Sequence, residues 1–466
     1  MKSRYDIIVI GAGPAGMTAA SLAAEHGASV ALLDEQSGLG GQIYRSVTCQ
    51  GASDPSILGA EYYQGKTLAD RLVKSTADHV KGASVWQISE DREVGVTVDG
   101  AACLVSADHV IIATGAQERP FPVQGWTLPG VMNAGAAQIL LKSSGVVLPD
   151  PVFVGTGPLL YLIAHQYLRA GVRIAAVLDT TPRENLRNAL WALPQAYRNA
   201  NQLWKGWGWL RDLRKSGTPF VRGVADIKIA SKDSAAQIEY KHEGVWKSLS
   251  AQTVLLHQGV VPNINLGMAT GCAHDWNDTQ LCWHAQLDAW GQSSIEGVSI
   301  AGDGASIMGA QGAEAAGALA ALGALHRIGK IDQHTRDDTG HPLHARLRSQ
   351  APFRRFLDML YRPALQFRVP REDTTIVCRC EEVTAAHVRD AVHLGCQGPN
   401  QLKSFTRAGM GPCQGRMCGL TVSAMIADQL GRPVQDIGAA RLRAPVKPLE
   451  LGQLAADFRI TGQRLR

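Results

Sequence analysis

Four cysteines near the end of the chain are the residues whose spacing most directly implies chemistry. Cys378 and Cys380 form a Cys-x-Cys pair in TTIVCRCEEVT, and after thirty-two intervening residues Cys413 and Cys418 form a Cys-x4-Cys pair in GPCQGRMCG. Thiolates in two close pairs suit a metal centre with tetrahedral sulfur sites. The Cys-x-Cys arm and the glycines beside Cys413 favour a [2Fe–2S] cluster with two ligands for each iron, and zinc stays open as the alternative.

Helix signals around these cysteines indicate how the site would be held. Thr384 is placed to cap a helix over TAAHVRDAVHLG, and Gly411 and Pro412 are expected to begin the last helix at the cluster. The segments CRCEEVT and GPCQGRMCG resemble the bacterioferritin-associated-ferredoxin type of [2Fe–2S] domain over about residues 371–430. This resemblance implies four metal ligands: Cys378, Cys380, Cys413 and Cys418.

A glycine-rich turn near the N-terminus predicts a dinucleotide site. Tyr5–Ile10 reads as a buried strand, GAGPAG follows, a helix-like stretch stops at Gly27, and a second apolar strand ends at Asp34. The three glycines permit a tight turn, backbone approach to a pyrophosphate, and close packing of helix on strand. The pyrophosphate is expected on the helix N-terminus and the acid on the ribose hydroxyls. The predicted contacts from this unit are Gly11, Gly13, Pro14, Ala15, Gly16, Asp34 and Glu35.

Three further segments favour FAD over NAD as the dinucleotide. The first, GLGGQIYR, follows the acid, the second is the apolar strand HVIIATGA, and the third, GVSIAGDGASIMGAQGAEAAG, reads as strand, small-residue loop and helix. Asp303 in the third segment is expected to bind a ribityl hydroxyl, and the N-terminus of the next helix is expected to face the flavin pyrimidine. The predicted contacts from these segments are Gly41, Gln42, Ala113, Thr114, Gly115, Gly302, Asp303, Gln311 and Gly312.

A second unit of the same type begins after WTLPGV. A strand at Pro151–Val154 leads into GTGPLL, a helix, and a strand that ends at Asp179, but Leu160 stands where the third glycine belongs. A leucine there separates helix from strand or fills the cofactor space, so this domain is predicted to be structural or to hold a different ligand rather than to be a working NAD site. A redox dithiol beside the flavin is also absent from the sequence, which argues against disulfide reduction.

Composition and length set the remaining limits. The chain has 466 residues, 45% of them hydrophobic and 19% charged, and a net charge of +5, which suits a soluble multidomain protein and does not suggest a nucleic-acid partner. With no signal-like segment or apolar run of the ~20 residues that span a bilayer, we expect a cytoplasmic protein with at most peripheral membrane contact. No HExxH, GxSxG or P-loop lysine motif occurs, so no catalytic residue is assigned.

The first 330 residues resemble flavoproteins with two dinucleotide-binding domains, the class that includes glutathione and thioredoxin reductases. The expected fold is therefore α/β, a Rossmann-like FAD domain with an inserted NAD-type domain, followed by a small helical [2Fe–2S] domain. The expected domains are 1–122 with 252–330 for FAD, 123–251 for the NAD-type domain, 371–430 for the cluster, with a linker and helix at 331–370 and a tail at 431–466.

The whole chain resembles the FAD-binding alpha (A) subunits of hetero-oligomeric opine and amino-acid dehydrogenases, on ATGAQERPFPVQGWTLPGVMNAGAAQ, HQGVVPN, AGDGASIMGAQ and the cysteine pairs. This resemblance implies electron transfer through FAD and a [2Fe–2S] cluster, while an FAD-dependent, amine-oxidase-type beta subunit oxidises an opine, such as octopine or nopaline, or D-hydroxyproline or proline. It also implies a quinone or dye-type acceptor, and allows an FMN shared with a partner and a small [2Fe–2S] gamma subunit. The rival hypothesis is a stand-alone NAD(P)H-dependent reductase.

A stretch rich in tryptophan and arginine, Arg187–Lys215, fits none of these motifs. Trp191, Trp204, Trp207 and Trp209 fall within it. They are consistent either with an aromatic face for a partner subunit or with an amphipathic helical pair packed on its own domain, and the sequence leaves both readings open.

Overall fold

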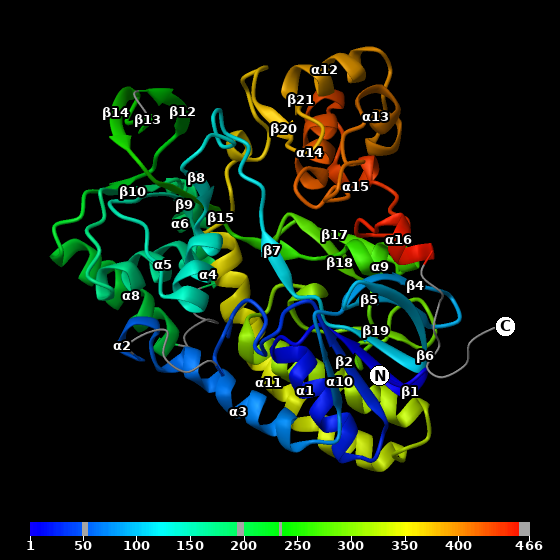
Figure 1. The fold of residues 1–466 in the computed structure, drawn as a ribbon. Helices are drawn as coiled ribbons and strands as arrows, with labels where there is room; N and C mark the ends of the chain where they lie inside the picture. The colour runs from blue at the N-terminus through cyan, green and yellow to red at the C-terminus, as the bar shows by residue number, and fades with distance from the viewer. Residues whose placement is uncertain (49–54, 193–199, 233–234, 456–466) are drawn as a thin grey trace.

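A computed structural model describes residues 1–48, 55–192, 200–232 and 235–455, and Figure 1 shows its domains. The first domain is built on a seven-stranded sheet in which β19 (Val298–Ile300) pairs with β6 in parallel. The other strands lie in the order β3 (Asp78–Lys81), β2 (Val30–Asp34), β1 (Arg4–Ile10), β6 (Ala101–Ile112), β5 (Glu93–Val98) and β4 (Ser84–Ile88).

Two helices of small residues cover this sheet. The second half of the parallel strand β1, Ile7–Ile10, is continuously apolar and buried, as expected for a strand covered on both faces. Helix α1 (Pro14–Glu25) and helix α10 (Ala310–Arg327) cross closely, because a Cβ on Gly317 would lie 2.1 Å from the Ala15 carbonyl oxygen. Helices α2 (Pro55–Leu58) and α3 (Ala60–Lys74) follow the first strands. The packing of α1 on α10 brings the starts of both helices to one edge of the sheet.

The second domain repeats the parallel arrangement. Its five-stranded sheet is flanked by α4 (Ala134–Ser144), α5 (Pro158–Arg169), α6 (Arg183–Ala189), the short helix η1 (Leu190–Ala192) and α8 (Ala200–Lys215). The strand order is β11 (Phe220–Arg222), β10 (Ala176–Asp179), β9 (Val152–Thr156), β15 (Val254–Gln258) and β8 (Val131–Asn133). Because β15 pairs with β9, the chain leaves this domain after 258, and the expected boundary at 252 is wrong.

Smaller sheets are attached to the two domains. An antiparallel sheet on the second domain contains β12 (Asp226–Lys232), β13 (Ala235–His242) and β14 (Val245–Ala251). Two antiparallel pairs complete the set: β7 (Ala116–Glu118) with β16 (Val260–Pro262), where the chain leaves and re-enters the first domain, and the hairpin of β17 (His274–Asn277) with β18 (Cys282–Ala285). Helix α9 (Asn265–Thr270) lies between these pairs in sequence, and the long helix α11 (Gln333–Leu360) packs on α10 within the expected linker, before η4 (Leu365–Phe367).

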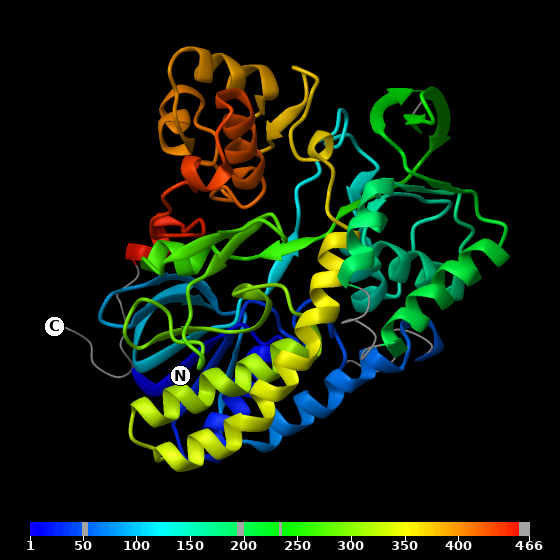
Figure 2. The ribbon, with the colours of Figure 1, turned by 180° about the vertical axis from the view of Figure 1, so that it is seen from behind.

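The C-terminal domain is small and mostly helical, and lies beside β17 and β18 (Figure 2). It contains the strands β20 (Ile376–Cys378) and β21 (Val383–Thr384), and the helices α12 (Ala385–His393), α13 (Pro399–Thr406), α14 (Gly419–Leu430) and α15 (Val434–Ile437). Helix α16 (Leu451–Ala455) follows and contacts β6 of the first domain. The C-terminal domain's own apolar core includes Cys378, Cys418 and Ile437. Thr384 caps α12 as predicted.

Two predictions about this region are wrong. The last helix at the cysteines begins at Gly419 rather than at Gly411 and Pro412, because residues 411–418 form turns. The expected tail from 431 is partly integrated, since Ile437 packs in the C-terminal core and Val446 in the core of the first domain. The last residues of that tail, 456–466, lie outside the described part of the chain.

Candidate functional site

The first glycine turn is a cradle in which side chains have no room. A Cβ on Gly11 would lie 2.5 Å from the Ala113 carbonyl oxygen, and one on Gly16 would lie 1.8 Å from the Gly11 carbonyl oxygen. Gly13 is the residue before α1, Pro14 takes the first helical position, and no side chain caps the helix. The backbone N–H groups at the start of α1 are therefore left for an anion.

Asp34 lies at the end of β2 beside this turn. One carboxylate oxygen accepts a hydrogen bond from the Ala12 N–H, and the other accepts from the Gln36 N–H at 2.7 Å. This fixes the carboxylate next to the cradle, where its remaining lone pairs suit ribose hydroxyls. Glu35 is exposed and pairs with Lys447, so its side chain is already engaged by the C-terminal segment.

The paired glycines before Tyr44 lie directly against the first turn. A Cβ on Gly41 would lie 2.8 Å from the Gly13 Cα, and Gly41 has φ of +59°. The Gln42 side chain is exposed, while its carbonyl accepts a hydrogen bond from Lys142 Nζ at 3.1 Å. Lys142 belongs to α4 of the second domain, is 4% exposed, and also donates to the Ile43 carbonyl at 2.9 Å. Sequence reasoning missed this lysine, because a buried lysine in a helix carries no motif.

The remaining predicted flavin segments meet at the same edge. A Cβ on Gly302 would lie 2.8 Å from the Ala15 Cβ, and one on Gly304 would lie 3.3 Å from the Gly115 nitrogen. Thr114 and Ala113 are thereby adjacent to the glycine turn and to the loop after β19.

Asp303 holds the start of α10. Its Oδ1 atom accepts the N–H groups of Met308 at 2.8 Å and Gly309 at 3.0 Å, and burial raises the pKa of this carboxyl. Gly312 is buried on α10, whereas Gln311 is exposed and bonded to Gln350.

The residues at this edge fit a bound FAD. The unfilled space beside Gly13, the uncapped start of α1 and the fixed carboxylate of Asp34 provide what a pyrophosphate and an adenosine ribose require. Residues 11–16, 34, 41, 113–115 and 302–303 are gathered there, and their individual contacts with the cofactor stay predictions.

The second glycine turn is built differently. Leu160 is fully buried in the core of this domain, and Asp179 accepts hydrogen bonds from the Thr181 N–H at 2.9 Å and from the Tyr161 side chain. A Cβ on Gly157 would lie 3.6 Å from Nε2 of His257, whose Nδ1 lies 2.6 Å from Glu118. The acid that would hold a ribose is thus engaged by the protein itself.

The four predicted cysteine ligands come together from two distant parts of the sequence. Cys378 contacts Cys418, and this contact lowers the pKa of Cys378 to about 5 and raises that of Cys418. Cys380 contacts Cys413, and burial raises the pKa of Cys380. Each contact pair takes one cysteine from each arm. Among the described residues, no group of three or more His, Cys, Asp or Glu side chains has the arrangement that one metal ion requires.

The backbone around the cysteines is tightly constrained. A Cβ on Gly411 would lie 2.3 Å from the Cys380 Cβ, and Gly409 lies close to the Cys418 sulfur. Backbone N–H groups of Gly409 and Glu381 donate to the Cys378 sulfur. Donors of this kind stabilise a negatively charged sulfur, which is the form that binds metal.

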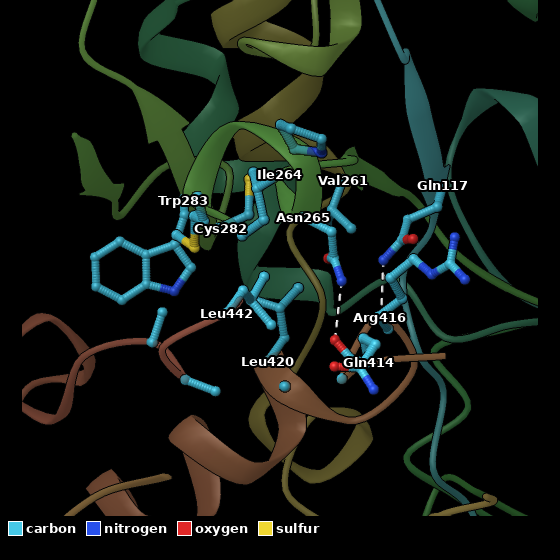
Figure 3. A pocket seen from close by; sticks show the side chains of 16 residues that line it. Gln117, Val261, Ile264, Asn265, Cys282, Trp283, Gln414, Arg416, Leu420 and Leu442 are labelled. Carbon is cyan, nitrogen blue, oxygen red and sulfur yellow. Dashed lines mark hydrogen bonds between the residues drawn. The ribbon is translucent and has the colours of Figure 1, made fainter. Parts of the chain in front are cut away.

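Two side chains of the first domain tie the cysteine loop to the flavin edge (Figure 3). Gln117 Nε2 donates to the Arg416 carbonyl at 2.8 Å, and Asn265 Nδ2 donates to the Gln414 carbonyl at 2.9 Å. Gln117 lies two residues after Gly115, whose carbonyl accepts the Asn263 N–H at 2.9 Å. A pocket lined by Trp283 and Leu420, among others, lies between the tethers and helix α14. The two predicted sites are therefore joined by a short, hydrogen-bonded path.

Comparisons with known proteins match both parts of the chain. Residues 5–317 match the pyridine nucleotide-disulphide oxidoreductase family, and residues 372–458 match the sarcosine oxidase A3 domain. The chain is similar in fold to L-proline dehydrogenase from P. horikoshii, with a TM-score of 0.69 at 18% identity over 97% of this chain and 80% of that one.

Named relatives match almost the full length. The A subunit of opine oxidase from Rhizobium meliloti is 44% identical over 98% of this chain and 88% of its own, and that from Agrobacterium tumefaciens is 45% identical over 97% and 91%. Hydrogen cyanide synthase subunit HcnB from Pseudomonas aeruginosa is 33% identical over 95% and 96%. With its FAD cradle and this full-length similarity, the chain belongs to the pyridine nucleotide-disulphide oxidoreductase family of FAD-dependent enzymes, in the group that contains the A subunit of opine oxidase.

Proposed function

We propose that this chain is the electron-transferring FAD and [2Fe–2S] subunit of a hetero-oligomeric dehydrogenase. In that complex an FAD-dependent, amine-oxidase-type beta subunit oxidises the C–N bond of a secondary-amine amino acid, an opine such as octopine or nopaline, or D-hydroxyproline or proline. The electrons leave through this chain to a quinone or dye-type acceptor. The similarity over nearly the whole chain to the A subunit of opine oxidase supports the donor class.

The observation that carries the proposal is the tether between the FAD edge and the cysteine loop. Gln117 and Asn265 bind carbonyls at positions 416 and 414, within the loop that connects Cys413 to Cys418. A bound flavin exchanges two electrons and an iron–sulfur cluster passes them singly. Residues that hold the two sites at a fixed separation serve such a relay.

The chain's own residues have defined tasks in this scheme. Asp34 and the backbone of residues 11–16 bind and orient the dinucleotide, and Asp303 fixes the start of α10 beside it. Cys378, Cys380, Cys413 and Cys418 would hold the cluster, and the N–H groups around Cys378 would stabilise its negative sulfur ligands.

The test is co-expression with the partner subunits, followed by anaerobic purification. We expect FAD, iron and acid-labile sulfide in this chain, an electron paramagnetic resonance signal after reduction, and opine- or proline-dependent reduction of a dye by the complex. Flavin extraction then separates FAD from an FMN shared with a partner. A complex that reduces the dye but contains zinc instead of iron would contradict the cluster, and one without amine-dependent activity would contradict the donor class.

The stand-alone NAD(P)H-dependent reductase is the competing proposal, because the second domain keeps the strand, glycine turn, helix and acid of a nucleotide fold. The buried Leu160 and the engaged Asp179 argue against it. Anaerobic addition of NADH or NADPH to the flavin-loaded chain discriminates the two proposals. Bleaching of the flavin absorbance would favour the reductase.

A further inference from the structure

Five large apolar side chains are exposed to solvent on the outer side of the second domain. Trp191 is 86% exposed, Trp204 66% and Trp207 54%. Leu186 and Leu190 on the neighbouring turns are also more than half exposed. We call these five residues the aromatic face. Helices α6 and α8 lie together, because Ala189 and Leu203 belong to one apolar cluster. Scattered exposed apolar residues need no explanation, but three tryptophans and two leucines on α6, η1 and α8 indicate a surface that binds something.

The aromatic face is distinct from the side of α8 that holds the domain together. On that inner side Leu213 is fully buried, Trp209 packs against the main core and Leu203 packs beside Phe356. Trp204 and Trp207 lie edge to face with ring centres 5.9 Å apart. Helix α8 therefore already has its packing partner, and the outer tryptophans are not needed to fold the domain.

Basic residues surround the aromatic face. Between positions 183–192 and 200–215, Lys and Arg occupy six positions and Asp and Glu two. Arg187, Arg214 and Lys215 form no ion pair with any residue that the structure describes, and Arg211 lies over the Trp207 ring at 5.5 Å. The excess positive charge is complementary to an anionic surface.

The position of the aromatic face argues against its being the binding site of the electron-donating subunit. Figures 1 and 2 both show α8 at the outer end of the second domain, with the C-terminal domain at the other side of the molecule. A partner that exchanges electrons with this chain has to approach the FAD edge or the cysteine loop. Attachment to a surface needs no electron path and can use a remote face.

We propose that the aromatic face binds the headgroup region of an anionic lipid membrane, as a peripheral attachment. Indole rings prefer this region because they pair a large apolar ring with an N–H donor, and Lys and Arg beside them attract anionic lipids. No helix among residues that the structure describes is long and apolar enough to cross a bilayer, and the attachment requires none. The inference does not depend on the redox chemistry proposed above.

The test is flotation of the assembled complex with vesicles of phosphatidylcholine alone and with phosphatidylglycerol added. We expect binding to the anionic vesicles that weakens with salt, and little binding to the neutral ones. The variant Trp191→Ser/Trp204→Ser/Trp207→Ser should bind the anionic vesicles at least about ten-fold more weakly, equivalent to ~1.4 kcal/mol. Trp246→Ser is the matched control, because this tryptophan is also exposed but lies on β14, outside the aromatic face.

A second variant tests the same surface independently, in case the tryptophan variant fails to fold. Arg187→Glu/Arg214→Glu/Lys215→Glu alters only exposed side chains, and it should also lose binding to the anionic vesicles. The proposal is overturned if the wild-type complex does not bind anionic vesicles, or if both variants bind them as strongly as the wild type does. It is also overturned if the tryptophan variant keeps its flavin but separates from its partner subunits in gel filtration, since the aromatic face would then be an interface between subunits.

Discussion

Replacing Lys142 by methionine tests whether the second domain holds the flavin-binding loop in place. The ammonium donates to the carbonyls of Gln42 and Ile43 and to Gln138 Oε1 at 3.0 Å, and its side chain is 4% exposed. Methionine keeps the length but donates nothing. Two loop carbonyls then lose their donor, at about 1–3 kcal/mol each, so Lys142→Met should cost roughly 2–6 kcal/mol and weaken FAD binding.

The difference in unfolding free energy between the wild type and Lys142→Met should depend on pH. Burial, and then the neighbouring Arg45, lowers the pKa of Lys142 to about 7. An unfolded lysine keeps its proton up to about pH 10.4, so above pH 7 the unfolded state binds more protons than the folded state, and this lysine makes stability rise with pH. Between about pH 6 and about pH 9 the gain is roughly 2.5 kcal/mol, at about 1.4 kcal/mol per unit above the folded pKa. The methionine variant lacks it, so its deficit should grow by that amount.

The assay is urea unfolding of wild type and variant at the two pH values, with FAD affinity measured by flavin fluorescence. Lys66→Met is the control, because Lys66 is an exposed lysine on the neighbouring helix α3 and its loss removes the same charge. A deficit that is equal at both pH values would refute the titration of Lys142. Unchanged FAD affinity would refute its role in holding the loop.

Three further variants test the geometry of the two sites. Gly41→Ala places a Cβ 2.8 Å from the backbone of the first glycine turn, and should lower FAD affinity at least about ten-fold in a fluorescence titration. Gly411→Ala drives a Cβ to 2.3 Å from that of Cys380, and should remove most of the bound iron measured by atomic emission while FAD stays. Gln117→Leu with Asn265→Leu removes both tethers, at about 1 kcal/mol each, and should speed proteolytic release of the C-terminal domain.

Local patterns predicted the elements of both nucleotide folds. The apolar run before each glycine turn, and the acid after the second strand, gave β1, α1, β2 and β9, α5, β10 within a few residues, because strand burial and turn chemistry are encoded over short distances. Thr384 was recognised as a helix cap for the same reason. The meeting of two cysteine pairs across thirty-two residues followed from ligand spacing rather than from helix or strand pattern.

Contacts between domains were beyond the reach of such patterns. Lys142, Gln117 and Asn265 each bond to a backbone carbonyl far away in sequence, and any segment offers carbonyls, so nothing near these residues marks them. The return to the first domain was misplaced because β15 is apolar like the strands on either side of the boundary, and only its pairing with β9 assigns it to the second sheet.

The two nucleotide folds show why a glycine fingerprint alone does not decide which cofactor is bound. In both, an acid ends the second strand, and both acids accept backbone N–H groups of the residues that follow. Asp34 opens onto the glycine cradle, whereas the hydroxyl of Tyr161 engages Asp179. Tyr161 directly follows Leu160, so the residue that replaces the third glycine and the residue that occupies the acid sit on the same turn of α5. Restoring the glycine alone would leave that acid engaged, so we predict that a variant of the second domain designed to bind NADH needs changes at both Leu160 and Tyr161.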